Sequence, residues 1–167
     1  MGTKSHKDRA PKNLRVGILS VSSTRSLKDD TSGHWIRHRA EKEGHQAVFH
    51  QVIPDDRAII GRTVMECIAE SRPDALLITG GSGISPKDVT IEAVEPLLDK
   101  VLTAFGPLFA QLSYEEIDSA ALLSRATAGV VGRTLVFCVP GSLKACKLAC
   151  KALIFPELGH MAAHLVE

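Results

Sequence analysis

A glycine-rich segment follows one of the most apolar short runs of the chain. After Ala75–Thr79 the sequence continues Gly-Gly-Ser-Gly. Glycine lets backbone N–H groups approach an anion closely, and the start of a following helix adds the positive end of a dipole. The segment therefore predicts a phosphate cradle formed by Gly80, Gly81, Ser82 and Gly83. It is not a Walker A loop, because that pattern does not fit around Lys87, and Pro86 stands where G-x-G-x-x-G needs its third glycine.

Two aspartates stand where a predicted strand or loop meets the next helix. Asp55 follows the predicted strand Gln46–Ile53, and Asp88 ends the glycine-rich loop. Ligands of open α/β sheets bind outside the carboxyl ends of the strands, so we expect both carboxylates at that edge. Two carboxylates beside a phosphate site favour Mg²⁺, which takes one or two carboxylates plus phosphate oxygens and water. For either aspartate alone a helix cap explains the position better, whereas the pair beside three glycines favours a functional site.

Two further polar segments join predicted elements at the same edge. Ser124 and Arg125 precede a predicted strand, and residues 140–142 (Pro-Gly-Ser) precede a predicted helix. Arg125 could clamp a phosphate, and Ser142 at a helix N-terminus could donate to an anion. Taken singly, an ion pair for Arg125 and a helix cap for Ser142 are the better interpretations.

Length and charge balance exclude several classes of function. The 167 residues, 44% hydrophobic and 23% charged, have the size of one domain with a sizeable core. Twenty Lys and Arg against nineteen Asp and Glu leave a net charge of +1, too balanced for a protein that coats nucleic acid. Aromatic residues make up 4% of the chain, too few for a base-stacking platform. No apolar run approaches the roughly 20 residues of a membrane span, so we expect a soluble protein without a membrane partner.

The first thirteen residues differ in charge from the rest. Four Lys and Arg oppose one Asp there, a net of +3, so the other 154 residues sum to −2. We interpret residues 1–13 as a disordered basic tail and residues 14–167 as a single domain. No signal-peptide pattern follows the tail, because Arg15 interrupts the first apolar segment and no small-residue cleavage site follows it. These features predict a cytoplasmic protein.

The cysteines and histidines lack a redox or zinc motif. The four cysteines form no C-x-x-C pair, and Cys146 and Cys150 are four residues apart on a predicted helix, so we expect reduced, packed thiols. Two histidine pairs have a spacing that can bind zinc: His34 with His38, and His160 with His164. Neither pair lies in an H-E-x-x-H context, so surface or core histidines are the favoured interpretation.

Hydrophobic patterns predict alternating strands and helices. Short runs of branched apolar residues predict strands at 14–21, 46–53, 75–79, 127–131 and 134–139. Helical spacing and end signals predict helices at 30–43, 56–71, 89–98, 105–112, 113–123, 143–153 and 156–166, the fifth starting from a capping box of Ser113 and Glu116. Gly132 and Arg133 fit the turn of a hairpin. We therefore expect an α/β fold, a three-layer sandwich with a mostly parallel sheet and one antiparallel element.

Five short motifs in a fixed order carry a family resemblance. They are Asp30-Thr-Ser-Gly33, Pro54-Asp55-Asp56, the run from Gly80 to Thr90, Leu123-Ser-Arg-Ala126 and Pro140-Gly141-Ser142. Together they resemble the motif set of the molybdenum cofactor biosynthesis protein B and molybdopterin adenylyltransferase family, from about residue 14 to the C-terminus. The protein B branch is the more similar one, because residues 113–117 (Ser-Tyr-Glu-Glu-Ile) and 156–160 (Pro-Glu-Leu-Gly-His) also resemble it.

The resemblance implies a molybdopterin-binding-like fold that assembles as a homotrimer or as a hexamer, a dimer of trimers. It also implies a reaction, the transfer of AMP from Mg-ATP to the terminal phosphate of molybdopterin with release of pyrophosphate. Asp55 and Asp88 would then be the catalytic, magnesium-organising carboxylates. The residues that would hold the phosphates or line the same pocket are Gly80, Gly81, Ser82, Gly83, Ser124, Arg125, Pro140, Gly141 and Ser142.

One residue near the predicted site departs from the family pattern, and a second function remains open. Ser23 stands where the family often has an aspartate after the first strand, which removes one possible metal or ribose contact. Trp35 is unusually large for its place on the first helix, and core packing or a subunit contact is its simplest interpretation. The alternative to an adenylyltransferase is a non-catalytic molybdopterin-binding or carrier paralogue of the same family. A purely structural or partner-binding role for the oligomer is a third, weaker alternative.

Overall fold

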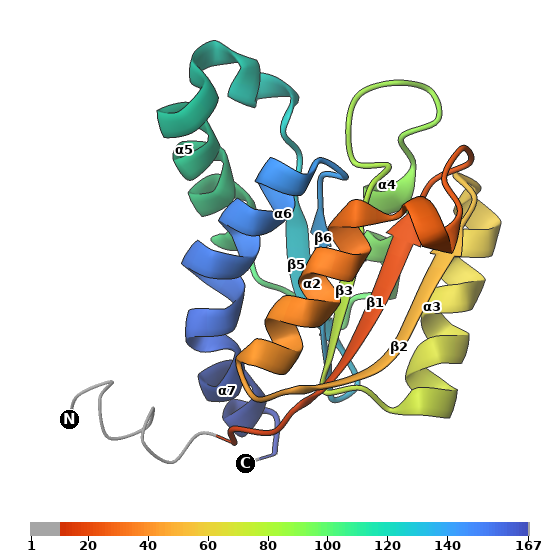
Figure 1. Ribbon diagram of the computed structural model, residues 1–167, viewed down its shortest axis with the longest axis vertical. Coiled ribbons are helices and arrows are strands. Elements are labelled where there is room, and N and C mark those ends of the chain that lie inside the picture. The colour runs from red at the N-terminus through yellow and green to blue at the C-terminus, as the bar shows by residue number, and fades with distance from the viewer. Residues whose placement is uncertain (1–10, 167) are drawn as a thin grey trace.

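Branched apolar residues form the central strands of a six-stranded sheet in the computed structural model, which describes residues 11–166 (Figure 1). The spatial order of the strands is β2-β1-β3-β6-β5-β4. Their bounds are β1 Arg15–Val21, β2 Gln46–Ile53, β3 Ala75–Thr79, β4 Lys100–Val101, β5 Thr127–Val131 and β6 Thr134–Val139. All residues of β3, β5 and β6 are buried, because helices cover both faces of the sheet.

One strand runs against the others. The strands β2, β1, β3 and β6 pair in parallel, so Ala75 lies opposite both Val16 and Leu135. The strand β5 is antiparallel to both its neighbours, β6 and β4, and the β5–β6 hairpin turns at Gly132 and Arg133 as predicted. The expected three-layer α/β sandwich with one antiparallel element is confirmed.

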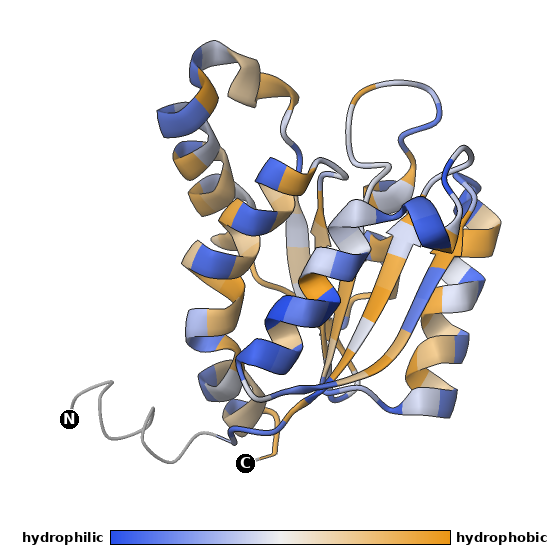
Figure 2. Ribbon diagram, viewed as in Figure 1, coloured by the Kyte–Doolittle hydropathy of each residue, from blue (hydrophilic) through white to orange (hydrophobic). Residues whose placement is uncertain are grey.

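Helices cover the sheet in two layers whose apolar sides face it (Figures 1 and 2). Residues of α2, α5, α6 and α7 pack on one face with alternate residues of β1 and β6, and residues of α3 and α4 pack on the other. The helix bounds are α2 Thr31–Lys42, α3 Arg57–Ser71, α4 Thr90–Val94, α5 Phe105–Ile117, α6 Leu143–Ala149 and α7 Phe155–His164. A π-helical segment, Cys150–Ile154, joins α6 to α7. Trp35 of α2 is partly buried and packs against the first of these two cores.

The prediction at Ser113 is wrong. Instead of capping a new helix, Ser113 is buried inside α5, which continues to Ile117 and breaks at Asp118, a residue with φ 51°. The segment Asp118–Leu123 is a 3-10 helix, η3, and it carries the chain over the carboxyl ends of the strands. Two other short elements, the 3-10 helix η2 (Glu95–Leu97) and β4, replace the end of the predicted helix 89–98 and the loop after it.

The predicted basic tail, residues 1–13, lies outside the described residues except for 11–13. Among residues 11–166, no helix has the length and apolar character needed to cross a membrane. The four cysteines are buried and free, as predicted.

Candidate functional site

A cavity of about 470 Å³ opens at the carboxyl ends of β1, β3 and β6, within the size range of small-molecule sites. We call it the edge pocket. Nine of the eleven predicted site residues lie on its wall: Asp55, Gly80, Gly81, Ser82, Gly83, Asp88, Ser124, Pro140 and Gly141. They come from the loops after β2, β3 and β6 and from the end of η3, so four segments distant in sequence meet at one edge as predicted.

The turn after β3 requires glycine at two consecutive positions. Gly80 and Gly81 have φ angles of 97° and 63°, a region that residues with a side chain rarely adopt. A Cβ atom at Gly80 would also overlap the carbonyl of Val21, and one at Gly81 would overlap the hydroxyl of Thr90. The sharp turn brings the chain from the end of β3 directly across the edge pocket.

Two loops of the edge pocket, those after β3 and β6, have carbonyl groups that accept hydrogen bonds from donors outside the pocket. Six carbonyls accept hydrogen bonds: Gly80 from Thr90 Oγ1 (2.8 Å), Gly81 from Thr90 N (2.9 Å), Ser82 and Gly83 from Arg125 Nε (2.9 and 3.1 Å), Pro140 from Thr79 Oγ1 (3.1 Å) and Gly141 from Ser32 Oγ (2.9 Å). None of these donor residues lines the edge pocket. These hydrogen bonds therefore direct all six carbonyls toward residues that do not line the edge pocket.

The orientation of the carbonyls sets the direction of the neighbouring N–H groups. No described peptide bond is cis, and in a trans peptide the N–H points opposite to the C=O of the preceding residue. The N–H groups that follow the six carbonyls therefore point away from those donors: Gly81, Ser82, Gly83, Ile84, Gly141 and Ser142. None of them donates to an acceptor among residues 11–166, and the buried hydroxyl of Ser82 also lacks a partner there. Four of these six residues, Gly81, Ser82, Gly83 and Gly141, line the edge pocket, and unpaired backbone N–H groups of this kind suit a multiply charged anion.

The two aspartates flank the same glycine loop. Asp55 Oδ2 accepts from the backbone and hydroxyl of Ser23, both at 2.8 Å, and Asp88 Oδ2 accepts from Ser85 N at 2.9 Å. A Cβ atom at Gly81 would lie 3.3 Å from Asp55 Oδ1, and one at Gly83 would lie 2.7 Å from Asp88 Oδ2, so both carboxyl groups touch this loop. Among the described residues, no hydrogen bond goes to the Oδ1 atom of either carboxylate.

This donor set fits Mg²⁺ bound together with a ligand. Within residues 11–166 no group of three or more Asp, Glu, His or Cys residues could hold a metal without help. Mg²⁺ commonly uses one or two carboxylates and completes its shell with phosphate oxygens and water. Asp55 and Asp88, each with one oxygen left over, can supply those carboxylate ligands.

Two predicted residues lie behind the pocket wall rather than on it. The Arg125 guanidinium donates to the loop carbonyls described above and to Glu92 Oε1, at 2.6 Å. The hydroxyl of Ser142 accepts from Ala145 N at 3.2 Å and so caps α6. The ion pair and the helix cap, which the sequence left open as alternatives, are therefore what the structure contains at these positions.

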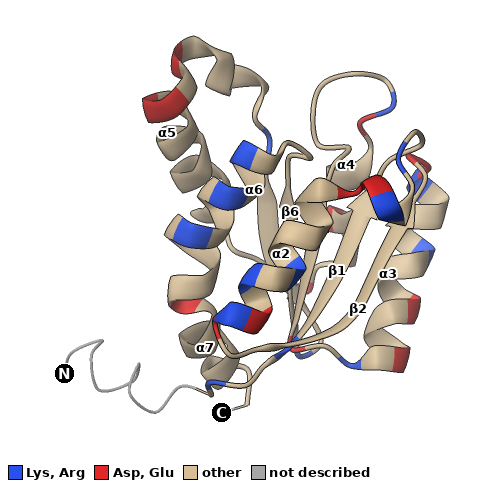
Figure 3. Cartoon of the chain, in the orientation of Figure 1, with Lys and Arg blue, Asp and Glu red and all other residues tan. Residues whose placement is uncertain are grey.

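Sequence reasoning missed two cations and one apolar wall of the edge pocket. Arg25, in the loop after β1, and Lys87, in the glycine loop, line the same cavity as the two aspartates, and basic and acidic residues gather on the loops at this end of the sheet (Figure 3). Ile117, Ala120 and Leu123 of α5 and η3 line the opposite side. The position of Arg25 after the first strand was the available signal for it, whereas the apolar wall depends on how η3 folds over the sheet.

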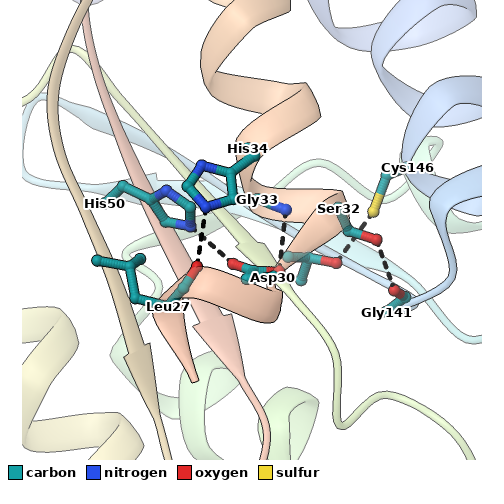
Figure 4. A network of polar contacts seen from close by, with 9 residues as sticks. Leu27, Asp30, Ser32, Gly33, His34, His50, Gly141 and Cys146 are labelled. Carbon is teal, nitrogen blue, oxygen red and sulfur yellow. Dashed lines mark hydrogen bonds and ion pairs between the residues drawn. The ribbon is translucent and has the colours of Figure 1, made fainter. Parts of the chain in front are cut away.

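A buried network supports the pocket loops from the start of α2 (Figure 4). Asp30 is 1% exposed and caps α2 by accepting from Gly33 N at 3.0 Å. Its other oxygen lies 2.6 Å from His50 Nε2. Burial alone would raise the pKa of Asp30, but the nearby Ser20 hydroxyl and the hydrogen bonds from His50 and Gly33 outweigh it and hold the pKa below its ordinary value. Ser32 lies in the first turn of α2, two residues after this cap, and its hydroxyl donates to the carbonyl of Gly141.

Comparisons with known proteins identify the family of the chain. Residues 17–160 match the family model described as a probable molybdopterin binding domain. The chain is 42% identical to molybdenum cofactor biosynthesis protein B of Bacillus cereus over 166 residues, 99% of this chain and 98% of that protein. The chain belongs to the molybdenum cofactor biosynthesis protein B family. The family resemblance inferred from the five motifs is thus confirmed.

Solved structures of the family have the same fold. A crystal structure of a molybdenum cofactor biosynthesis protein B matches with a TM-score of 0.91 and 42% identity, covering 95% of this chain and 99% of that one. The tungsten cofactor synthesizing protein MoaB from Pyrococcus furiosus matches with a TM-score of 0.85 and 37% identity, over 95% of this chain and all of that one. The molybdopterin-binding-like fold expected for this protein B chain is therefore confirmed.

Proposed function

We propose that this protein B family member acts in molybdenum cofactor biosynthesis by transferring AMP from Mg-ATP to the terminal phosphate of molybdopterin. A phosphate oxygen of molybdopterin attacks the α-phosphorus of ATP, the bond to the bridging β-oxygen breaks, and pyrophosphate leaves. The observation that carries the proposal is the row of unpaired N–H groups on the two pocket loops, between Asp55 and Asp88. Two anionic groups must meet in this reaction, so the site has to neutralise charge and align them.

Each part of the edge pocket has a task in this reaction. The loop N–H groups and Ser82 hold the phosphates of ATP in a fixed direction. Arg25 and Lys87 supply positive charge near the same phosphates. Asp55 and Asp88 would hold Mg²⁺, which when bound lowers the negative charge on the triphosphate. A carboxylate base is not needed, because a phosphate monoester is already largely ionised at neutral pH.

The apolar wall suits a planar ring. Ile117, Ala120 and Leu123 face the polar loops across the edge pocket. Ligand pockets of this kind combine an apolar surface for a ring with a few polar groups that fix its orientation. We assign this wall to the ring system of one of the two substrates, with its phosphates directed toward the glycine loop.

The test is AMP incorporation. Purified protein is incubated with molybdopterin, Mg²⁺ and ATP labelled at the α-phosphate. The proposal predicts label in the pterin product and one pyrophosphate released per AMP transferred. Pterin binding without any transfer would contradict it.

A non-catalytic molybdopterin-binding or carrier function is the second candidate. It is favoured by Ser23, which provides a hydroxyl where the family often has a carboxylate. Asp55 therefore accepts hydrogen bonds from Ser23, and a second carboxylate is absent from this position. Calorimetry with ATP separates the candidates: an affinity that requires Mg²⁺ supports the enzyme, and its absence supports the carrier.

We also propose that the chain assembles as a homotrimer or as a dimer of trimers. The exposed apolar residues Leu108 (47%) on α5 and Leu122 (86%) on η3, which do not line the edge pocket, support an interface on that side. Sedimentation equilibrium at several concentrations tests it, and a protein that remains monomeric would contradict it.

A further inference from the structure

Arg125 is the one cation of the predicted site whose hydrogen bonds go to the backbone of the glycine loop. Its Nε group lies 2.9 Å from the carbonyl of Ser82 and 3.1 Å from that of Gly83. Its Nη1 group lies 2.6 Å from Glu92 Oε1, on the helix that follows the loop. One guanidinium therefore joins the loop to α4 from the side away from the edge pocket.

We infer that Arg125 is a positioning residue: together with Glu92 it turns the N–H groups of Gly83 and Ile84 toward a diphosphate or triphosphate in the edge pocket. This inference rests on the proposed function, because it assumes that the pocket binds phosphates. The peptide planes after Ser82 and Gly83 can rotate about the soft backbone angles of glycine. With both carbonyls tied to Arg125, the following N–H groups remain directed at the pocket before the ligand arrives, which lowers the cost of ordering them on binding.

A direct clamp on phosphate is the competing role for Arg125. The two roles predict different effects of one substitution on the affinity for the anion. Glu92→Gln removes the carboxylate that holds Arg125 and also removes a negative charge near the anion site. If Arg125 were a clamp, its guanidinium would be freer to reach the phosphate, so affinity would stay the same or increase. If Arg125 is a positioning residue, the loop loses its anchor and affinity decreases.

The choice of variants keeps the fold intact. Glu92 is 41% exposed at its side chain and Arg125 is 35% exposed, so conservative substitutions at these positions leave the core unchanged. Arg125→Lys retains the positive charge but lacks the planar guanidinium whose separate N–H groups reach the two carbonyls and Glu92 together. Arg62→Ala is the matched control, because Arg62 forms an exposed pair with Glu66 on α3 and does not line the edge pocket.

The experiment is calorimetric titration of inorganic pyrophosphate, with Mg²⁺ present, into the wild-type protein and the variants Arg125→Lys, Arg125→Ala, Glu92→Gln and Arg62→Ala. We expect the dissociation constant to rise about tenfold in Arg125→Lys and about threefold in Glu92→Gln, and to stay unchanged in Arg62→Ala. In Arg125→Ala, millimolar methylguanidinium should restore part of the lost affinity, whereas equal ionic strength from sodium chloride should not. Restoration of this kind distinguishes positioning from a general loss of stability.

The outcomes separate the two proposals. A wild-type protein that binds pyrophosphate, with Glu92→Gln binding it equally well or more tightly, overturns the positioning role and leaves the proposed function standing. A wild-type protein that binds no pyrophosphate overturns both.

Discussion

Ser23 and Asp55 hold each other across the carboxyl ends of β1 and β2. The backbone N–H and the hydroxyl of Ser23 both lie 2.8 Å from Asp55 Oδ2, and Asp55 N lies 3.1 Å from the Ser23 hydroxyl oxygen. This closed set of bonds fixes the Asp55 carboxyl group at the wall of the edge pocket and leaves Oδ1 beside Gly81. A serine thus fixes the direction of the remaining carboxylate oxygen, so the loop after β1 contributes to the site without adding negative charge.

Asp55→Asn should abolish most of the proposed AMP transfer while the fold persists. The amide keeps the size of the side chain but removes the charge that a metal requires, and we expect a rate loss of about 100-fold or more. The neighbouring variant Asp56→Asn is the control, because Asp56 caps α3 by accepting from Ile59 N, and asparagine caps helices equally well. Initial rates of labelled AMP transfer measure the effect. Equal rates in the two variants would remove Asp55 from the site.

Gly80→Ala should destabilise the protein far more than Gly132→Ala. Both glycines have a positive φ, so each substitution costs about 1 to 2 kcal/mol in backbone strain. A Cβ at Gly80 would in addition overlap the Val21 carbonyl, whereas a Cβ at Gly132 would meet nothing within 4 Å. Urea unfolding of the two variants therefore isolates the cost of the overlap. Equal losses of unfolding free energy would show that the turn after β3 relaxes without difficulty.

The buried Asp30 should make stability decrease at acid pH. Its pKa is held below the ordinary 3.8, so the folded state favours the ionised form. Asp30→Asn keeps the cap on α2 but loses the charge, and we expect it to cost about 1 to 3 kcal/mol at neutral pH. The stability that the charge provides is present above the ordinary pKa of an aspartate. It is lost as the pH falls through the lowered pKa of the folded protein.

Urea unfolding from pH 7 to pH 2.5 checks this pH dependence. The difference between wild type and Asp30→Asn should be constant at neutral pH and should shrink only below about pH 4. Asp29→Asn serves as the control, because Asp29 is exposed and, among residues 11–166, its side chain accepts only from Ser26 Oγ. A difference that persists unchanged to the lowest pH would contradict a charged, hydrogen-bonded Asp30.

The four cysteines should resist thiol reagents in the native protein. All four are buried, and burial raises the pKa of the Cys67 and Cys146 thiols, as it does for Cys138 and Cys150. The reactive thiolate is therefore scarce at pH 8. Ellman's reagent should react with all four thiols in urea and only slowly without it. Rapid reaction of one native thiol would indicate an open segment around it.

The strands could be predicted because they are short apolar runs bounded by residues that favour turns. The run Ala75–Thr79 consists of apolar residues and one threonine between a proline-containing loop and glycines, and the strand has the predicted bounds. Ser113 shows where a sequence pattern alone is misleading. Ser113 and Glu116 fit a capping box, but Ser113 lies within α5 and is buried. The two residues of β4 are too few to form a pattern at all.

The residues of the site could be predicted from the sequence, but the direction of its backbone N–H donors could not. Asp55, Asp88 and the glycines follow from the rule that ligands bind at the carboxyl ends of strands. The direction of the loop N–H groups depends on bonds such as that from Ser32 to Gly141, which spans 109 positions, and no local pattern encodes such a pairing. Arg125 is likewise placed behind the loop by bonds to residues distant in sequence, the carbonyls of Ser82 and Gly83.

Amide spectra recorded during a titration with Mg-ATP test the central claim most directly. The ¹H–¹⁵N signals of Gly81, Ser82, Gly83, Ile84, Gly141 and Ser142 should shift together and saturate with one dissociation constant. The Gly132 signal, whose N–H already donates to Asp99 at 2.7 Å in the hairpin turn, should stay in place. Saturable binding that moves other amides and leaves these six unchanged would contradict the assignment of the edge pocket as the phosphate site.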